Sequence, residues 1–97
     1  MYQITYTQAA LEDLQWFRKQ EQATILDGID ANLQYEPTRT TRNRKPMRTN
    51  PIATWELRLG DFRVLYNVGE AVSIVEIQRI GEKRGSQFLF RGKGENL

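Results

Sequence analysis

The stretch from Trp55 to Glu82 restricts the fold most, because it places two turn signals between runs of strand-forming residues. Gly60-Asp61 and Gly69-Glu70 are glycine-first pairs, which favour the two-residue type II′ turns of β-hairpins. Two such turns in succession predict an antiparallel meander of three strands that share the middle one.

Two-residue turns would determine how these strands pair. Arg58 would then face Arg63 across the first turn, and Arg63 would face Glu76 across the second. Because side chains alternate along a strand, one face of the sheet would carry an apolar set: Trp55, Leu57, Leu59, Phe62, Val64, Tyr66, Val75 and Ile77. The other face would carry a polar set, with Leu65, Val72 and Ile74 near one end: Glu56, Arg58, Arg63, Asn67, Glu76 and Gln78.

The predicted Arg58–Arg63 pair has two interpretations. Like charges directly opposite each other destabilise a sheet, so the pair calls for a compensating interaction. Glu56 and Glu76 could neutralise the arginines in a solvated ion-pair cluster. Alternatively, the two guanidinium groups could form a fork that binds a phosphate.

Length and composition narrow the function classes. A chain of 97 residues can build one small domain. The absence of cysteine and histidine makes a zinc site improbable and excludes a histidine general base. The chain has no long apolar run for a membrane span, and its first residues lack a signal-peptide pattern, so we expect a cytoplasmic location and no membrane partner.

Charge is distributed unevenly along the chain. Residues 1–37 hold two basic and six acidic residues, a net charge of −4, whereas residues 38–97 hold twelve basic and six acidic residues, a net charge of +6. A run without acidic residues contributes five of these cations: Arg39, Arg42, Arg44, Lys45 and Arg48. The run is either an extended connection available to an anionic partner or simply a solvated loop.

The first part of the chain predicts a strand followed by helices. Residues 2–6 alternate between apolar and polar side chains, as a half-buried strand does, and Thr7 can cap a helix. Apolar residues at three- and four-residue spacing predict helix over residues 8–35. Residues 18–22 contain no glycine or proline to mark a turn, but we expect two helices, because a single helix would outrun so small a sheet. Gly28 inside the second helix indicates close packing.

These elements predict an α+β domain in which the helices cover the apolar face of the sheet. The opposite face would stay open to a partner, and the basic residues around it suit a nucleic-acid backbone. We expect a single domain over residues 1–97, with a basic loop at 38–50 and a tail at 89–97 that could be flexible.

The chain resembles the RelE/ParE superfamily of toxins from toxin–antitoxin systems over about residues 2–88. The resemblance rests on Thr7-x-x-Ala10-x-x-Asp13-Leu14, a proline after the second helix, and the segments WELRLGDFRVLYNV and VSIVEIQRIGEKRG. It implies a small cytoplasmic toxin that a cognate antitoxin holds inactive. In the RelE branch the toxin cuts messenger RNA on the ribosome, without a metal or other cofactor, which inhibits translation and arrests growth. In the ParE branch the target is DNA gyrase.

The resemblance also implies roles for individual residues. Arg63 matches the phosphate-side arginine of the family, and Arg58 falls where the preceding strand often carries lysine or arginine. Glu56 falls where some members have a second lysine. Arg84 resembles the arginine after the last strand, with Lys83 as the alternative. The candidate catalytic residues are therefore Arg63, Arg84, Arg58 and Lys83. The candidate RNA-binding residues are Arg39, Arg42, Arg44, Lys45, Arg48 and Phe88.

The sequence offers several candidates for the residues that would transfer protons. Phe88 stands where the family often has a tyrosine, and phenylalanine can stack on a base but cannot transfer a proton. Cleavage by a ribose 2′-hydroxyl needs a base, and Glu56, Glu76 and Lys83 are candidates. The alternatives are a ParE-like or nuclease-inactive protein that binds gyrase or RNA without cutting, and a metal-dependent nuclease built from Glu56, Asp61 and Glu76. Opposing arginines disfavour the last of these.

Overall fold

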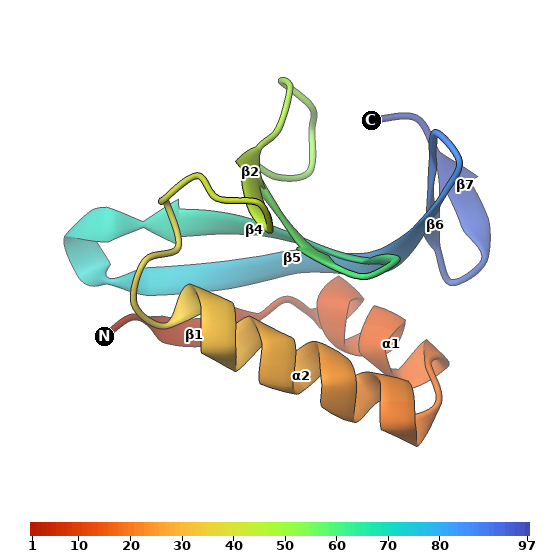
Figure 1. The fold of residues 1–97 in the computed structure, drawn as a ribbon, viewed down its shortest axis with the longest axis horizontal. Coiled ribbons are helices and arrows are strands. Elements are labelled where there is room, and N and C mark those ends of the chain that lie inside the picture. The colour runs from red at the N-terminus through yellow and green to blue at the C-terminus, as the bar shows by residue number, and fades with distance from the viewer.

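A computed structural model describes all residues from 1 to 97. The elements follow one another in this order: β1 (Gln3–Tyr6), α1 (Gln8–Trp16), α2 (Lys19–Leu33), β2 (Arg44–Pro46), β3 (Trp55–Leu59), β4 (Phe62–Gly69), the 3₁₀ turn η1 (Glu70–Val72), β5 (Ile74–Arg84), β6 (Gln87–Phe90) and β7 (Lys93–Glu95). Both helices lie on one face of a single sheet (Figure 1). The predicted α+β architecture is confirmed.

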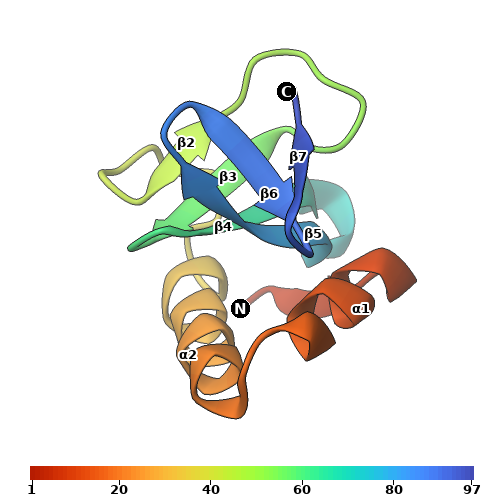
Figure 2. The same cartoon turned by 90° about the vertical axis from the view of Figure 1, so that its right-hand side faces the viewer.

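The sheet is larger than the predicted meander. Its order is β2-β3-β4-β5-β6-β7, all antiparallel, and β1 pairs in parallel with β5. Strand β2 lies within the predicted basic loop, whereas β6 and β7 form a hairpin in the last part of the chain. This hairpin curves over the sheet face opposite the helices (Figure 2).

The first hairpin has the predicted register. Arg58 faces Arg63 and Trp55 faces Tyr66 across the Gly60-Asp61 turn. Gly60 has a φ of 60°, a conformation that glycine adopts without the steric cost of a Cβ. The tight turn therefore sets the β3–β4 pairing as expected.

The second hairpin departs from the prediction. The connection is η1 followed by Ser73 in the left-handed region at φ 54°, so Gly69 pairs with Ile74 rather than closing a two-residue turn. A bulge then adds one residue, Gln78, because Tyr66 pairs with Ile77 but Leu65 pairs with Arg79. The predicted Arg63–Glu76 pair is wrong for these two reasons, and Arg63 faces Gly81.

The apolar face of the sheet packs on the helices as predicted. Leu57, Val64 and Tyr66 are fully buried in one cluster with the apolar side chains of α1 and α2, and Trp55 and Phe62 pack against it. The bulge allows Ile77 and Ile80 to point into the same core although they are three residues apart.

The opposite face is only partly open, contrary to expectation. Leu65, Ala53, Phe88 and Phe90 form a second buried cluster there, under the loop before β3 and the β6–β7 hairpin. The chain thus covers part of this face itself. The covering segments rise above the sheet on either side (Figure 1).

Local hydrogen bonds explain the two-helix arrangement. The Thr7 side chain accepts a hydrogen bond from the Ala10 N–H and caps α1, as predicted. The predicted break between two helices lies at Phe17 and Arg18, because both residues are extended. Glu21 accepts from the Arg18 N–H at 3.1 Å, which satisfies one of the free donors at the start of α2.

Asp13 of α1 fills a gap along the edge of β5. Strand β1 pairs with Ile74–Ile77 and β6 with Glu82–Arg84, so the backbone between them has no neighbouring strand. The fully buried Asp13 carboxylate accepts from the Ile80 N–H at 3.0 Å and from the Arg79 guanidinium at 2.6 and 3.0 Å. Arg91 in the β6–β7 turn lies 3.1 Å from the same carboxylate. The hydrogen bond to Asp13 raises the pKa of Arg79.

We expect Asp13→Asn to destabilise the fold strongly, because it removes one partner of a buried ion pair. Such a loss typically costs about 3–5 kcal/mol. Urea unfolding should show this decrease in the free energy of unfolding. Glu12→Gln is the matched control: Glu12 is an exposed neighbour that also contacts Arg91, at 3.5 Å, and its loss should cost at most about 1 kcal/mol. Equal effects of the two variants would contradict a special role for Asp13.

Two glycines mark places where backbones and side chains approach closely. Gly28 lies against Leu59, as its predicted packing role requires: a Cβ at this position would lie 2.5 Å from Leu59 Cδ1. A Cβ on Gly81 would collide with the backbone carbonyl of Leu89 and lie 2.7 Å from the Phe90 ring. The Gly81 clash is harder to relieve, because a strand backbone cannot rotate away as the end of a side chain can.

We therefore expect Gly81→Ala to push β6 away from β5 and to destabilise the protein by about 1–3 kcal/mol, as overpacking does. Thermal unfolding measures the loss. Ser86→Ala, at an exposed position in the β5–β6 turn, is the control and should leave the melting temperature unchanged. A Gly81→Ala variant as stable as the control would show that the β6–β7 hairpin is not held against β5 as described.

Candidate phosphate-binding pocket

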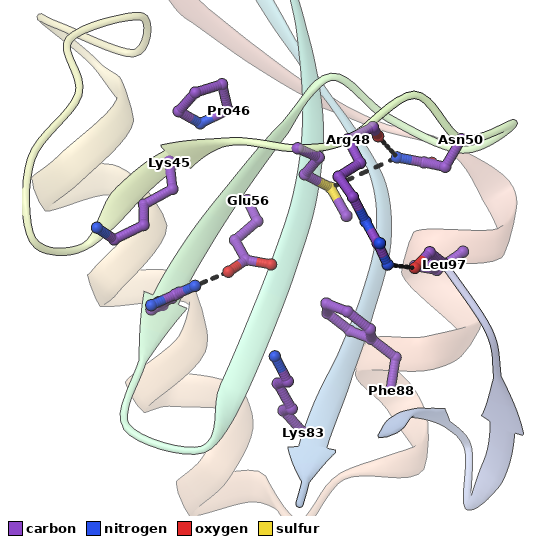
Figure 3. A pocket seen from close by; sticks show the side chains of 10 residues that line it. Lys45, Pro46, Arg48, Asn50, Glu56, Lys83, Phe88 and Leu97 are labelled. Atoms are coloured by element: carbon purple, nitrogen blue, oxygen red, sulfur yellow. Dashed lines mark hydrogen bonds and ion pairs between the residues drawn. The ribbon is translucent and has the colours of Figure 1, made fainter. Parts of the chain in front are cut away.

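A pocket of about 220 Å³ lies between the loop before β3 and strand β6 (Figure 3). Its floor is the sheet face opposite the helices. It is lined by side chains from β2 and the following loop, β3, β5, β6 and the last residue: Lys45, Pro46, Met47, Arg48, Asn50, Glu56, Arg58, Lys83, Phe88 and Leu97.

Strand geometry explains why these charges meet. Glu56 and Arg58 are two residues apart on β3, so they point to the same face of the sheet. Lys45 of β2 is the neighbour of Glu56 across the strands. Lys83, near the C-terminal end of β5, and Arg48, in the loop between β2 and β3, also line the pocket (Figure 3). Four cations and one side-chain carboxylate thus line the same pocket, and Arg48 Nη2 donates to the main-chain oxygen of Leu97 at 2.9 Å.

Glu56 is that carboxylate, and it is buried, with 5% of its surface exposed. Its Oε1 atom lies 2.5 Å from Arg58 Nε, an ion pair that compensates the burial of charge. The Oε2 atom makes no hydrogen bond within the protein. Since Arg63 Nε is the only buried side-chain polar atom without a partner, Oε2 must be in contact with solvent.

Phe88 forms one wall of the pocket but is only 8% exposed. Its ring stacks on Phe90 with 6.4 Å between centroids and an angle of 8°. The Lys83 ammonium lies 5.3 Å from the Phe88 ring centroid, within the range of a cation–π interaction. Phe88 therefore supports Lys83 and offers little free surface for stacking.

Arg63 does not join Arg58 in a fork. Arg58 turns toward Glu56, whereas Arg63 Nη1 donates to the backbone carbonyls of Gly60 and Phe62 at 2.6 and 2.9 Å. Burial lowers the pKa of Arg63; Glu56 opposes this effect and Arg58 adds to it. The two arginines are neighbours in register but have different partners, and Arg63 does not line the pocket.

The remaining candidate cations lie outside the pocket. Arg84 is 71% exposed and lies 3.5 Å from Glu82. Arg44 donates to the Asn32 carbonyl at 2.6 Å and to the Arg39 carbonyl at 3.1 Å, so it ties the loop to the end of α2. Arg39 pairs with Glu36 at 2.9 Å.

Arg42 is exposed on the same loop. Of the predicted site residues, the pocket brings together Lys45, Arg48, Arg58, Lys83 and Phe88.

Asn50 is a pocket residue that the sequence interpretation missed. Its Oδ1 atom accepts from the Ile52 and Ala53 N–H groups at 2.8 and 3.0 Å, and its amide donates to the Arg48 carbonyl at 2.7 Å. These bonds shape the loop that carries Arg48. The signal was the Asn50-Pro51 dipeptide, which favours a turn.

The chemical capacity of the pocket follows from its side chains. Lysine and arginine donate hydrogen bonds to an anion, and an ionised glutamate can accept a proton. No group of three or more acidic side chains in the chain could hold a metal ion. No helix is long and apolar enough to cross a membrane.

Solved structures from toxin–antitoxin complexes superpose on most of this chain. No protein-family model and no curated protein matches the chain. A chain of the toxin–antitoxin complex RelBE2 from Mycobacterium tuberculosis superposes with a TM-score of 0.73 and 27% identity, over 84% of this chain and 98% of that one. The archaeal RelE–RelB complex from Pyrococcus horikoshii OT3 gives 0.67 and 26%, over 87% and 96%.

The isolated RelE toxin from E. coli identifies which component is matched. It superposes with a TM-score of 0.66 at 18% identity, over 88% of each chain. The similarity thus concerns the toxin rather than the antitoxin and spans nearly the whole matched chains. The chain has the RelE-family toxin fold, the fold found in toxins of toxin–antitoxin modules.

Proposed function

We propose that this protein is the toxin of a toxin–antitoxin module and that it cuts messenger RNA on the ribosome without a metal ion, thereby inhibiting translation. The single observation that carries the proposal is the pocket that Lys45, Arg48, Arg58 and Lys83 line together with Glu56. The fold supports the toxin assignment, because two of its relatives above 25% identity come from complexes with an antitoxin.

The charges of the pocket match what RNA cleavage requires. Attack of a ribose 2′-hydroxyl on the adjacent phosphate creates extra negative charge on the phosphoryl oxygens. Fixed cations that are already in place stabilise this charge most effectively. Arg58 is held by its ion pair with Glu56 and Lys83 by the Phe88 ring, so neither long side chain has to be ordered when the phosphate enters.

The distribution of charge over the molecule favours one orientation on RNA. The strand β1 and the two helices lie in the part of the chain with a net charge of −4, and most of the basic residues lie in the sheet and its loops. A polyanion would be attracted to the pocket side and repelled by the helical side. Exposed Arg42 and Arg84 flank the pocket elements and would contact neighbouring phosphates, with Arg39 and Arg44 in supporting positions.

One observation favours a second candidate function. No tyrosine or histidine lines the pocket. If Glu56 and Lys83 do not transfer protons, the same cations would bind RNA, or gyrase as in the ParE branch, without cutting. Both candidates share the cognate antitoxin as partner, so only an assay of the target distinguishes them.

Expression of the protein without an antitoxin should arrest growth and should produce new RNA 5′ ends within translated regions. The ends should disappear when ribosomes are kept off the transcript, for example by deletion of its ribosome-binding site. Growth arrest with intact transcripts would leave the non-cutting toxin, and a DNA-damage response would indicate gyrase. Harmless expression would contradict the toxin assignment itself.

Loss of Lys83 should reduce toxicity more than stability, whereas loss of Arg58 should reduce both, because it leaves the buried Glu56 without its ion-pair partner. Arg58→Ala and Lys83→Ala should each slow cleavage by about 10²-fold or more, as removal of one charge-stabilising donor commonly does. Arg18→Ala is the matched control, since its side chain is 90% exposed at the start of α2.

Arg63→Ala tests the remaining candidate on the same scale. We expect a loss of toxicity with little change in melting temperature. If toxicity persists and the melting temperature drops sharply, Arg63 only braces the Gly60-Asp61 turn.

A further inference from the structure

We infer that Glu56 is the general base that takes the proton from the ribose 2′-hydroxyl, an inference that rests on the proposed RNA cleavage. The sequence alone left Glu56, Glu76 and Lys83 as candidates for this role. The geometry of the pocket separates them.

Glu56 is the only side chain lining the pocket that accepts protons in its usual charged state. The other lining side chains are cationic, amide or apolar. Glu76 does not line the pocket; it faces Asn67 on β4 and accepts a hydrogen bond from Gln78. Lys83 lines the pocket, but as a base it would have to be neutral and would lose the charge that attracts phosphate.

The two oxygens of Glu56 are in different situations. Arg58 Nε holds Oε1 at 2.5 Å and so fixes the direction of the carboxylate. Oε2 has no partner within the protein and is in contact with solvent. Figure 3 shows the carboxylate directed into the space between Lys45, Arg48 and Lys83. A 2′-hydroxyl brought there by its phosphate would find one free acceptor oxygen.

The proton inventory of the reaction then balances. The 2′-oxygen forms a bond to phosphorus as its proton moves to Glu56 Oε2. The bond from phosphorus to the 5′-oxygen breaks, and this oxygen takes a proton from the Lys83 ammonium. The products are a 2′,3′-cyclic phosphate and a 5′-hydroxyl end, and water exchange returns the proton from Glu56 to Lys83.

A purely electrostatic role for Glu56 makes the opposite prediction for its removal. If the carboxylate only neutralised or positioned Arg58, Glu56→Gln would leave a more positive pocket and could still accept from Arg58 Nε through its amide oxygen, so it should bind RNA more tightly and keep most of the cleavage rate. If Glu56 is the base, the same variant should bind equally well or better and cut far more slowly.

The test is single-turnover cleavage of a short messenger RNA on purified ribosomes, with binding measured in parallel. Glu56→Gln should lower the cleavage rate about 10²- to 10⁴-fold, the usual contribution of a general base, without weakening binding. Glu56→Asp keeps the carboxylate and should recover part of the rate. Equal melting temperatures would show that both variants remain folded.

A substrate with a sulfur atom in place of the 5′-oxygen separates the base from the acid, because a thiolate leaves without a proton. Lys83→Ala should recover on this substrate the part of its defect that comes from the missing acid, and keep the part that comes from the missing charge, whereas Glu56→Gln should recover nothing. Two results for the Glu56→Gln variant would show that Glu56 is not the base: cleavage of ordinary RNA at the full rate, or recovery of the rate on the sulfur-containing substrate. Either result would leave the proposed function standing. An unmodified protein that cuts neither RNA would overturn the proposed function and this inference with it.

Discussion

The carboxylate of Asp13 connects the helical layer to the sheet where β5 lacks a neighbouring strand. It is fully buried, and it accepts from the backbone of Ile80, from Arg79 and from Arg91. An isolated buried carboxylate would be very costly, so the network has to form as a whole. Because its partners come from α1, β5 and the β6–β7 turn, the position of each element depends on the other two.

The pocket depends on this connection although Asp13 lies on the other side of the sheet. Arg91 and the Arg79 guanidinium, which lies 4.4 Å from the Phe90 ring centroid, hold the β6–β7 hairpin in place. Phe90 stacks on Phe88, and Phe88 supports Lys83. A chain of contacts therefore leads from the core of the helical layer to a cation of the pocket. Stability and the geometry of the site are not independent in so small a protein.

Local signals in the sequence predicted the elements that depend on neighbouring residues, and they failed where distant contacts decide. The β3–β4 register was predictable because Gly60-Asp61 is a tight turn between two regular strands. The β4–β5 register was not, because Ser73 adopts the left-handed conformation usual for glycine and because the bulge at Gln78 accompanies a contact between Ile80 and Asp13, 67 residues apart.

Strand β6 did carry a signal, the alternation of Phe88 and Phe90, but the glycine-rich residues around it concealed a hairpin. For the pocket, strand alternation predicted that Glu56 and Arg58 share a face; their ion pair depends on side-chain rotamers that no spacing rule specifies.

A negative side chain, Glu56, stands on β3 at a position where a positive one is found in some relatives, and this changes the charge of the pocket. The resemblance to the RelE branch places a lysine in some members where this chain has Glu56, so the local charge differs by two units. Lys45 and Arg48 enter the pocket from the β2 segment and offset that difference. At the same time Phe88 stands where a tyrosine is common, and its ring contacts Lys83 instead of offering a hydroxyl. The departure at Phe88 removes a proton-transfer group from β6, and in the proposed cleavage the strands β3 and β5 supply such groups through Glu56 and Lys83.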